Sequence, residues 1–229
     1  MLEYICISII LLIFIPIIYV RIRYPFWSTQ PIFHSYDYLR YLTKTPHEIH
    51  TQVYSKSFKK DFNVQSMRFL DMDEKELDKM IDLLQCHSVE SSQMLSLIDK
   101  PTMTTTHTGQ FFPSYVSVYR KDKYDITHDT NGAISIQNTP QIIGCMTGKT
   151  VNMFILDKSG VLYEKTGYFW DNICVHREYI KENIGRKMIQ AHDIYQRTYT
   201  PSISMSLFKK EINLCEGVVP LVQYPVYTF

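Results

Sequence analysis

The chain has 229 residues, of which 45% are hydrophobic and 21% are charged, and its formal net charge is +1. This composition is typical of a globular protein and excludes wholesale disorder and fibrous structure. The near-neutral charge argues against a nucleic-acid partner, because binding through phosphates requires a large basic excess. The five cysteines form no CxxC pair and the histidines no HExxH pattern, so we expect no bound metal and a reducing compartment.

The chain begins with an uncharged apolar stretch, YICISIILLIFIPIIYV, at residues 4–20. It is close to the minimum length that spans a bilayer, and it is apolar all round, which disfavours a buried core helix. A cleaved signal peptide is disfavoured because no basic residue precedes the stretch and no A-x-A site follows it. Arg21 and Arg23 follow it, so the positive-inside rule places the rest of the chain in the cytosol. We therefore predict a single-pass N-terminal membrane anchor over residues 1–23 and a cytosolic domain over residues 24–229.

The first part of this domain mixes irregular and helical patterns. Residues 24–60 show little periodicity and are predicted to form an extended arm. Residues 73–85 predict an amphipathic helix. Its inner face carries four apolar residues, Leu77, Met80, Ile81 and Leu84. Residues 100–110 are polar and are predicted to form a loop.

The second part is dominated by strand patterns. The expected strands are 115–119, 133–137, 141–147, 150–156 and 161–176. A hairpin turn is predicted at residues 158–160, a helix at 184–197 and further strands within 202–229. This order of elements predicts an α+β domain in which one helix crosses between two strands.

The segment from residue 166 to residue 197 is the most informative. Its long strand is predicted to end in a short loop, KENIG, that opens directly onto a helix, and the N–H groups at a helix start bind phosphate. The string NICVHREYIKENIGRKMI, at 172–189, resembles the acyl-CoA-binding segment of the N-myristoyltransferase family, a branch of the GNAT acyltransferases. Residues 24–31, YPFWSTQP, resemble the family's FWDTQP arm. Residues 141–146, QIIGCM, resemble its LVGFIS strand, and Tyr199-Thr200 matches a YT that follows the motif helix.

The resemblance implies a single GNAT-like domain, with a mixed, mostly antiparallel sheet splayed between two central strands and helices on both faces. It implies acyl-CoA as donor, with myristoyl-CoA favoured by the arm, and a protein or peptide as acceptor. The backbone N–H groups of Asn172 and Ile173 would form an oxyanion hole for the thioester carbonyl, and Thr200 would lie near the acceptor amine. The implied cofactor-binding residues are Tyr24, Phe26, Trp27, Asn172, Ile173, Cys174, Val175, Lys181, Asn183, Ile184 and Gly185.

The chain departs from the family pattern in ways that leave the base and the acceptor open. Ile180 and Asn183 stand where the family has arginines, and the length accommodates only the first of the family's two halves. The family's C-terminal carboxylate, which deprotonates the acceptor amine, therefore has no counterpart. Asp171 stands beside the oxyanion pair and is a candidate general base if burial raises its pKa. A solvated or capped aspartate at a strand end is the alternative.

Three functions follow from these observations. The favoured one is a membrane-anchored N-acyltransferase that moves a fatty acyl group from CoA to a protein amine by direct attack. The alternative is a catalytically inactive GNAT-fold protein that acts as a structural or acyl-CoA-binding component, which the lost arginines motivate. A GNAT enzyme with a short donor such as acetyl-CoA is the third, and the resemblance to the FW arm disfavours it.

Overall fold

A computed structural model describes residues 2–23, 63–87, 98–128, 134–156 and 160–208. The N-terminal helix α1 (Leu2–Arg23) belongs to a different unit of the chain from the sheet, and the two are described separately. Within these ranges, no helix is found that is long and apolar enough to cross a membrane. The segment predicted as an anchor is helical over Leu2–Arg23. The predicted arm, with Tyr24, Phe26 and Trp27, lies outside the described residues.

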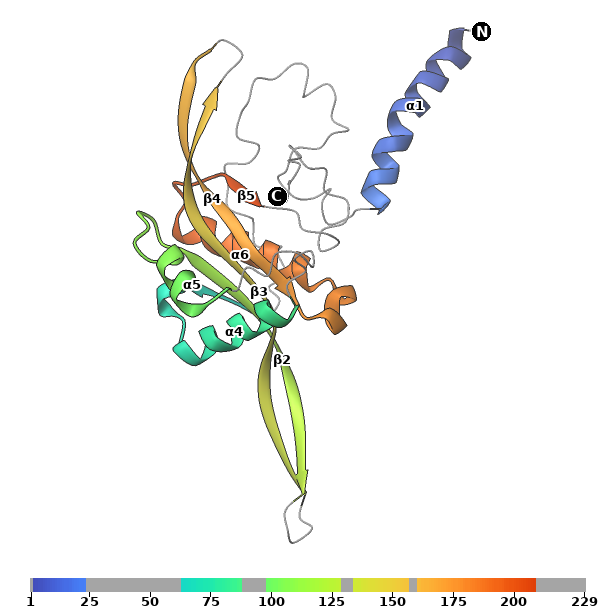
Figure 1. Cartoon of the computed structure of the whole chain (residues 1–229). Helices are drawn as coiled ribbons and strands as arrows, with labels where there is room; N and C mark the ends of the chain where they lie inside the picture. The colour runs from blue at the N-terminus through green and yellow to red at the C-terminus, as the bar shows by residue number, and fades with distance from the viewer. Residues whose placement is uncertain (1, 24–62, 88–97, 129–133, 157–159, 209–229) are drawn as a thin grey trace, which may run out of the picture. The chain divides into compact units, whose positions relative to one another are not determined.

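The larger unit is built on a five-stranded sheet in the order β1-β2-β3-β4-β5 (Figure 1). Its strands are β1 (Val64–Arg68), β2 (Tyr115–His128), β3 (Ile134–Leu156), β4 (Leu162–Val175) and β5 (Ser206–Phe208). The first four pair antiparallel, and β5 joins β4 in parallel. A parallel pair needs a crossover connection, which α6 (Ile184–Tyr199) supplies. The predicted mixed, mostly antiparallel sheet with one crossing helix is thus confirmed.

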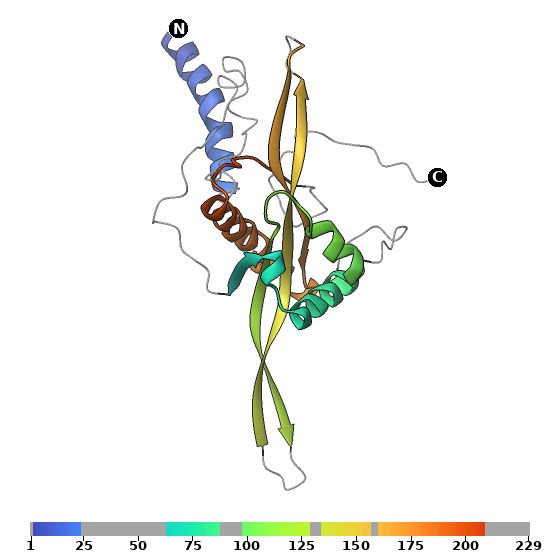
Figure 2. The same cartoon turned by 90° about the vertical axis from the view of Figure 1, so that its left-hand side faces the viewer.

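Helices cover both faces of this sheet (Figure 2). Two of them, α4 (Glu74–His87) and α5 (Lys100–His107), lie on one face, and α6 lies on the other. Two 3-10 helices, η1 (Phe69–Asp71) and η2 (Arg177–Glu182), precede α4 and α6. The predicted arrangement of helices on both faces is confirmed.

The main apolar core lies between the sheet and the α4–α5 layer. Its buried members are Phe69, Leu77, Met80, Ile81, Leu83, Leu84, Met103, Val116, Val118, Ile142, Cys145 and Cys174. All four residues of the predicted inner face of α4 are among them. The amphipathic pattern therefore identified the buried side of this helix correctly.

The prediction of a loop over residues 100–110 is wrong, because most of this segment is α5. Asp99 caps the helix, its Oδ1 accepting a hydrogen bond from the backbone N–H of Thr102 at 3.0 Å, and Pro101 occupies the first turn. Threonine has low helix propensity, which explains the prediction. Burial of Met103 and His107, one helical turn apart on the core side, outweighs that propensity.

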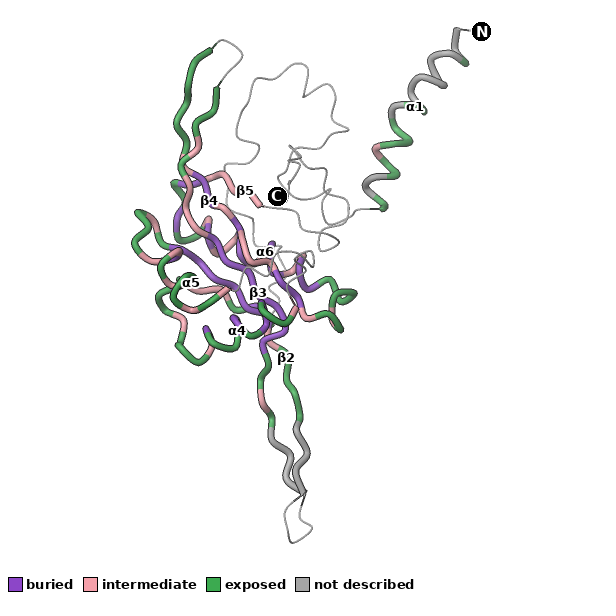
Figure 3. Tube along the Cα trace, viewed as in Figure 1, coloured by how far each residue is buried: buried purple, intermediate pink, exposed green. Residues whose placement is uncertain are grey.

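The predicted short strands join into longer ones. Segments 133–137, 141–147 and 150–156 form one strand, β3, and the predicted strand 115–119 extends to His128. As a result, the β2–β3 and β3–β4 hairpins project beyond the core from opposite ends of the sheet (Figures 1 and 3). Of the predicted C-terminal strands, only β5 falls within the described residues.

On the α6 face, buried polar side chains join the sheet to the helix. Trp170 Nε1 donates to Gln196 Oε1 at 2.8 Å, and Gln196 Nε2 donates to Ser206 Oγ at 3.0 Å. His192 is fully buried and its Nδ1 lies 2.9 Å from Ser117 Oγ. These contacts fix α6 against β2, β4 and β5.

Candidate functional site

A β-bulge interrupts β4 at the position that the sequence predicts for the oxyanion hole. Cys174 pairs with Cys145 and Asp171 with Thr147, so two residues of β4, Asn172 and Ile173, stand opposite one residue of β3. Asn172 has φ 53°, in the left-handed region that asparagine tolerates better than most residues. Bulges of this kind re-aim groups next to active sites. They provide a place where a strand can turn its backbone N–H groups away from the ladder.

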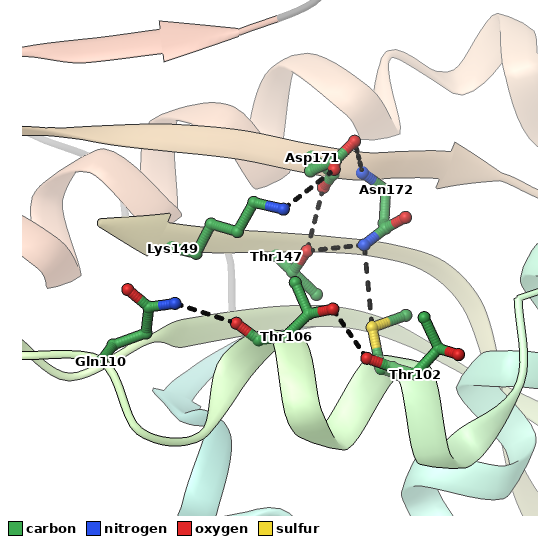
Figure 4. Close-up of polar contacts among 8 residues, drawn as sticks. Thr102, Thr106, Gln110, Thr147, Lys149, Asp171 and Asn172 are labelled. Atoms are coloured by element: carbon green, nitrogen blue, oxygen red, sulfur yellow. Dashed lines mark hydrogen bonds and ion pairs between the residues drawn. The ribbon is translucent and has the colours of Figure 1, made fainter. Parts of the chain in front are cut away.

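The side chain of Asn172 fastens the bulge to the α5 side of the sheet (Figure 4). Its Nδ2 donates to Thr147 Oγ1 at 2.9 Å and lies 3.7 Å from Met103 Sδ of α5. Thr147 Oγ1 in turn donates to the backbone carbonyl of Asp171 at 3.3 Å. These contacts hold the left-handed conformation in place.

Asp171 lies directly at the bulge, half-buried. Its Oδ1 accepts a hydrogen bond from the backbone N–H of Asn172 at 3.0 Å, and its Oδ2 lies 3.9 Å from Lys149 Nζ (Figure 4). The N–H group predicted to bind a thioester oxygen is therefore engaged by the neighbouring carboxylate. The predicted role of Asn172 requires Asp171 to release this N–H, and both roles stay predictions.

Two charged or titratable residues beside the bulge were missed by the sequence reasoning. Lys149 lies two residues after Thr147 on the same face of β3, a period-two signal that was available in the sequence. His107 lies buried at the end of α5, its ring stacked on Phe69 with centroids 4.6 Å apart. Its Nδ1 has no hydrogen-bond partner among the described residues. Only the unexpected helix α5 brings it to this part of the molecule.

Burial is the main influence on the pKa values of the two buried histidines, His107 and His192. It lowers the pKa of His107 to about 4, with Lys149 acting in the same direction and Asp171 against it. It lowers the pKa of His192 to about 3, with a smaller contribution from His107. Both imidazoles are therefore neutral in the folded protein at neutral pH.

These pKa values predict acid sensitivity. The unfolded chain takes up protons on both histidines below pH 6.5 and the folded chain does not, so their contribution to stability is complete above pH 6.5. It is lost as the pH falls toward about 4 for His107 and about 3 for His192. Going from about pH 7 to about pH 5, we expect each to cost about 2 kcal/mol in the free energy of unfolding.

Urea unfolding of the parent chain and of His192→Asn at both pH values tests this. Asparagine does not titrate, and its amide can replace the hydrogen bond to Ser117. The variant should be less stable at neutral pH but should lose about 2 kcal/mol less on acidification. An identical loss in both proteins would contradict the prediction.

The predicted pyrophosphate loop lies where β4 passes into α6. Asn183 has φ 58° and caps α6, Ile184 and Gly185 are buried, and Lys181 is exposed. The first turn of α6 contains no acidic residue, which suits an anionic ligand at the helix start. Glu182 lies just before this helix, and its Oε1 forms an ion pair with Lys121 Nζ at 3.1 Å.

Three other predicted residues are buried. Cys174 and Val175 have side chains in the protein interior, so a cofactor would meet them through the backbone alone. Thr200 is buried at the end of α6, where its Oγ1 lies 2.7 Å from Tyr115 Oη and 3.3 Å from Tyr168 Oη. This contact lies on the α6 side of the sheet. The structure does not bring Thr200 to the side chain of Asp171, and its predicted role near the amine stays a prediction.

An open cavity of about 390 Å³ lies between the C-terminal half of α4, the β2–β3 hairpin and His176. The ring of His176 lies against that of His87, with centroids 3.9 Å apart. None of the predicted site residues lines this cavity. Among the residues that the structure describes, no group of His, Cys, Asp or Glu side chains is arranged to hold a metal ion.

Three features of this unit are consistent with a GNAT-like fold. They are the mixed sheet, the crossover helix α6 between the parallel strands β4 and β5, and the bulge in β4 before that helix. No family model matches the sequence, and no curated protein matches it. Among solved structures, glucosamine-6-phosphate N-acetyltransferase from Arabidopsis thaliana is similar at 11% identity and a TM-score of 0.41, over 72% of this chain and 97% of that one.

Two further structures are similar at the same distant level. An aminoglycoside 6'-N-acetyltransferase from Acinetobacter baumannii has 11% identity and a TM-score of 0.38, over 72% of this chain and 99% of its own. Saccharomyces cerevisiae N-myristoyltransferase with bound myristoyl-CoA has 14% identity and a TM-score of 0.43, over 81% of this chain and 40% of its own. Likeness at this level carries no argument about activity or substrate.

Proposed function

We propose that the chain is an N-acyltransferase that moves an acyl group from CoA to an amine. The bulge at Asn172 carries the proposal. There a bulge interrupts the pairing of β4 with β3, ten residues before the end of η2 at Glu182, and the first turns of α6 that follow carry basic residues. A thioester carbonyl at the bulge and phosphates at the helix start would then lie along one continuous stretch of chain.

In this proposal Asp171, Asn172 and Ile173 have different roles in the reaction. Asp171 turns away from the N–H of Asn172 and takes the proton of the attacking amine. The amine nitrogen bonds to the thioester carbon, and the N–H groups of Asn172 and Ile173 donate to the oxygen that becomes negative. The carbon–sulfur bond then breaks, the amide forms, and the proton held by Asp171 passes to solvent or to the departing CoA thiolate.

The finer proposal is a fatty acyl donor, myristoyl-CoA, and a protein or peptide acceptor. The resemblance of residues 24–31 to the arm that covers the acyl-CoA in the N-myristoyltransferase family supports it. We also propose that α1 attaches the chain to a membrane with the domain on the cytosolic side. The exposed apolar side chains of α1, such as Leu11 and Leu12, support this attachment. Partition of the chain into vesicles, and its loss when both leucines are replaced by lysine, tests it.

The first test is thermal stability of the chain titrated with CoA, acetyl-CoA and myristoyl-CoA. A ligand that binds only the native state stabilises it by about 2.7 kcal/mol at a concentration of 100 times its dissociation constant. We expect all three to raise the midpoint of unfolding, and myristoyl-CoA to raise it most at equal concentration. Binding of acetyl-CoA as tight as that of myristoyl-CoA would contradict the fatty acyl donor.

The second candidate is a GNAT-fold protein without turnover. The hydrogen bond from the N–H of Asn172 to Asp171 favours it, because the proposed oxyanion donor is already engaged. The absence of a stabilising effect from every CoA compound would favour this structural function over catalysis.

A further inference from the structure

The carboxylate of Asp171 holds the N–H group that the proposed reaction needs. Its Oδ1 accepts the hydrogen bond from the backbone N–H of Asn172 at 3.0 Å. A thioester oxygen can accept from this N–H only after the carboxylate has left it. Because an ionised, half-buried group that loses a hydrogen bond is costly to leave without a replacement, the release of the N–H requires another partner for Asp171.

Lys149 supplies a cation at this position. Its Nζ lies 3.9 Å from Asp171 Oδ2, which makes an ion pair that is about 1 Å longer than a hydrogen bond between a cation and a carboxylate (Figure 4). The contact seen in the structure is therefore loose. A small rotation of the two side chains would convert it into a charge-assisted hydrogen bond, which is roughly twice as strong as a neutral one.

The surroundings of Lys149 keep its ammonium group beside the bulge. Lys149 pairs with Phe169 across the β3–β4 ladder, and its Nζ lies 5.9 Å from the centre of the Phe169 ring. Only 25% of the lysine side chain is exposed. Within the described part of the chain, Asp171 is the only carboxylate with which Lys149 forms an ion pair. The charge of Lys149 is therefore available to Asp171 and to no other described acid.

The neighbouring imidazole of His107 leaves this pair undisturbed at neutral pH. Burial lowers the pKa of His107 to about 4, so its ring is neutral there. A neutral ring does not repel Lys149 or attract Asp171 as a charged imidazolium would. The balance at the bulge is therefore set by the carboxylate, the lysine and the N–H group.

We propose that Lys149 is a positioning residue that draws the carboxylate of Asp171 away from the N–H of Asn172 and frees this N–H for the thioester oxygen. It acts through Asp171 and does not touch the reacting atoms. When the donor binds, the N–H passes from Asp171 to the thioester oxygen, and Asp171 gains a hydrogen bond from Lys149. The carboxylate exchanges one donor for another, so the release is not opposed by an unpaired charge. This inference rests on the acyl transfer proposed above.

The test compares the full parent chain with Lys149→Met, Lys149→Arg and Lys165→Met. Methionine keeps an unbranched apolar side chain and removes the charge. Arginine keeps the charge and donates hydrogen bonds to carboxylates. Lys165 is an exposed lysine of β4 that lies opposite Met153, so Lys165→Met is the matched control. Circular dichroism and the midpoint of urea unfolding verify that each variant folds.

Hydrogen exchange of the Asn172 amide reports its release and does not depend on catalysis. The amide exchanges when its N–H leaves Asp171, and Lys149 stabilises that released state. In nuclear magnetic resonance spectra of the isotopically labelled chain, we expect exchange at Asn172 to be about 10-fold slower in Lys149→Met than in the parent. Lys149→Arg should restore the parent rate, and Lys165→Met should match it. Equal exchange in Lys149→Met and the parent would overturn the proposal.

Acyl transfer gives a second readout. In Lys149→Met we expect kcat for release of CoA from myristoyl-CoA to fall about 10-fold, with KM for myristoyl-CoA within about twofold of the parent value, because the lost interaction helps only after the donor is bound. Lys149→Arg should recover most of kcat. An unchanged kcat in Lys149→Met, beside an active parent, would overturn the role of Lys149. A parent that transfers no acyl group but shows the expected exchange would overturn the proposed function and support the release of the N–H by Lys149.

Discussion

Replacement of Asp171 by asparagine is expected to lower the rate of acyl transfer to an amine by about 10²–10⁴-fold. The substitution keeps an oxygen that can accept the hydrogen bond from the N–H of Asn172, and it keeps the size of the side chain. It removes the ability to take a proton and the attraction to Lys149. The bulge geometry should therefore survive while the proposed base is lost.

The measurement is release of CoA from myristoyl-CoA in the presence of peptides with a free N-terminal amine. Thermal stabilisation by myristoyl-CoA should be the same in Asp171→Asn as in the parent, which separates binding from chemistry. Glu164→Gln is the matched control, because it neutralises an exposed carboxylate elsewhere on β4. Full activity of Asp171→Asn would remove Asp171 as the base and leave it as a capping residue at the bulge.

Replacement of Gly148 by alanine is expected to lower the free energy of unfolding by about 3 kcal/mol. A methyl group at this position would lie 2.6 Å from Nε2 of His192 and 3.3 Å from Cδ1 of Trp170. His192 is fully buried and its other ring nitrogen is held by Ser117, so the imidazole cannot move aside without breaking that contact. Close packing in the interior transmits the strain to α6.

Gly144→Ala is the matched control, because it also adds a methyl group on the α6 face of β3. Its nearest neighbours are Met188 Sδ at 3.0 Å and Ile184 Cγ2 at 3.1 Å. Methionine is flexible and adapts to small changes, so we expect a loss below about 1.5 kcal/mol. Urea unfolding of both variants measures the difference. In a double-mutant cycle, His192→Ala should recover part of the loss caused by Gly148→Ala. Equal losses for the two glycine variants would contradict this account of the packing.

Much of the fold could be predicted because local patterns and tertiary burial agree there. The helix α4 was predicted over nearly its full length, since its apolar stripe matches the side that the sheet covers. The order of a long strand followed by a helix was predicted from β4 to α6, but the short loop predicted at residues 181–185 is wrong, because the 3-10 helix η2 reaches Glu182 and α6 begins at Ile184. The helix α5 was missed, since its threonines disfavour a helix locally and only the burial of Met103 and His107 selects it.

The sequence by itself determined the α+β class, the crossing helix α6 and the position of Asn172 beside Asp171 near the end of β4. Only the tertiary structure decided that Asn172 adopts a left-handed bulge conformation, because that conformation depends on Thr147 and Met103, which lie far away in the chain. It also decided that Lys149 approaches Asp171, and that Thr200 is buried against two tyrosines on the other side of the sheet. Strand pairing and helix packing bring residues together across dozens of positions, and no local pattern in the chain carries that information.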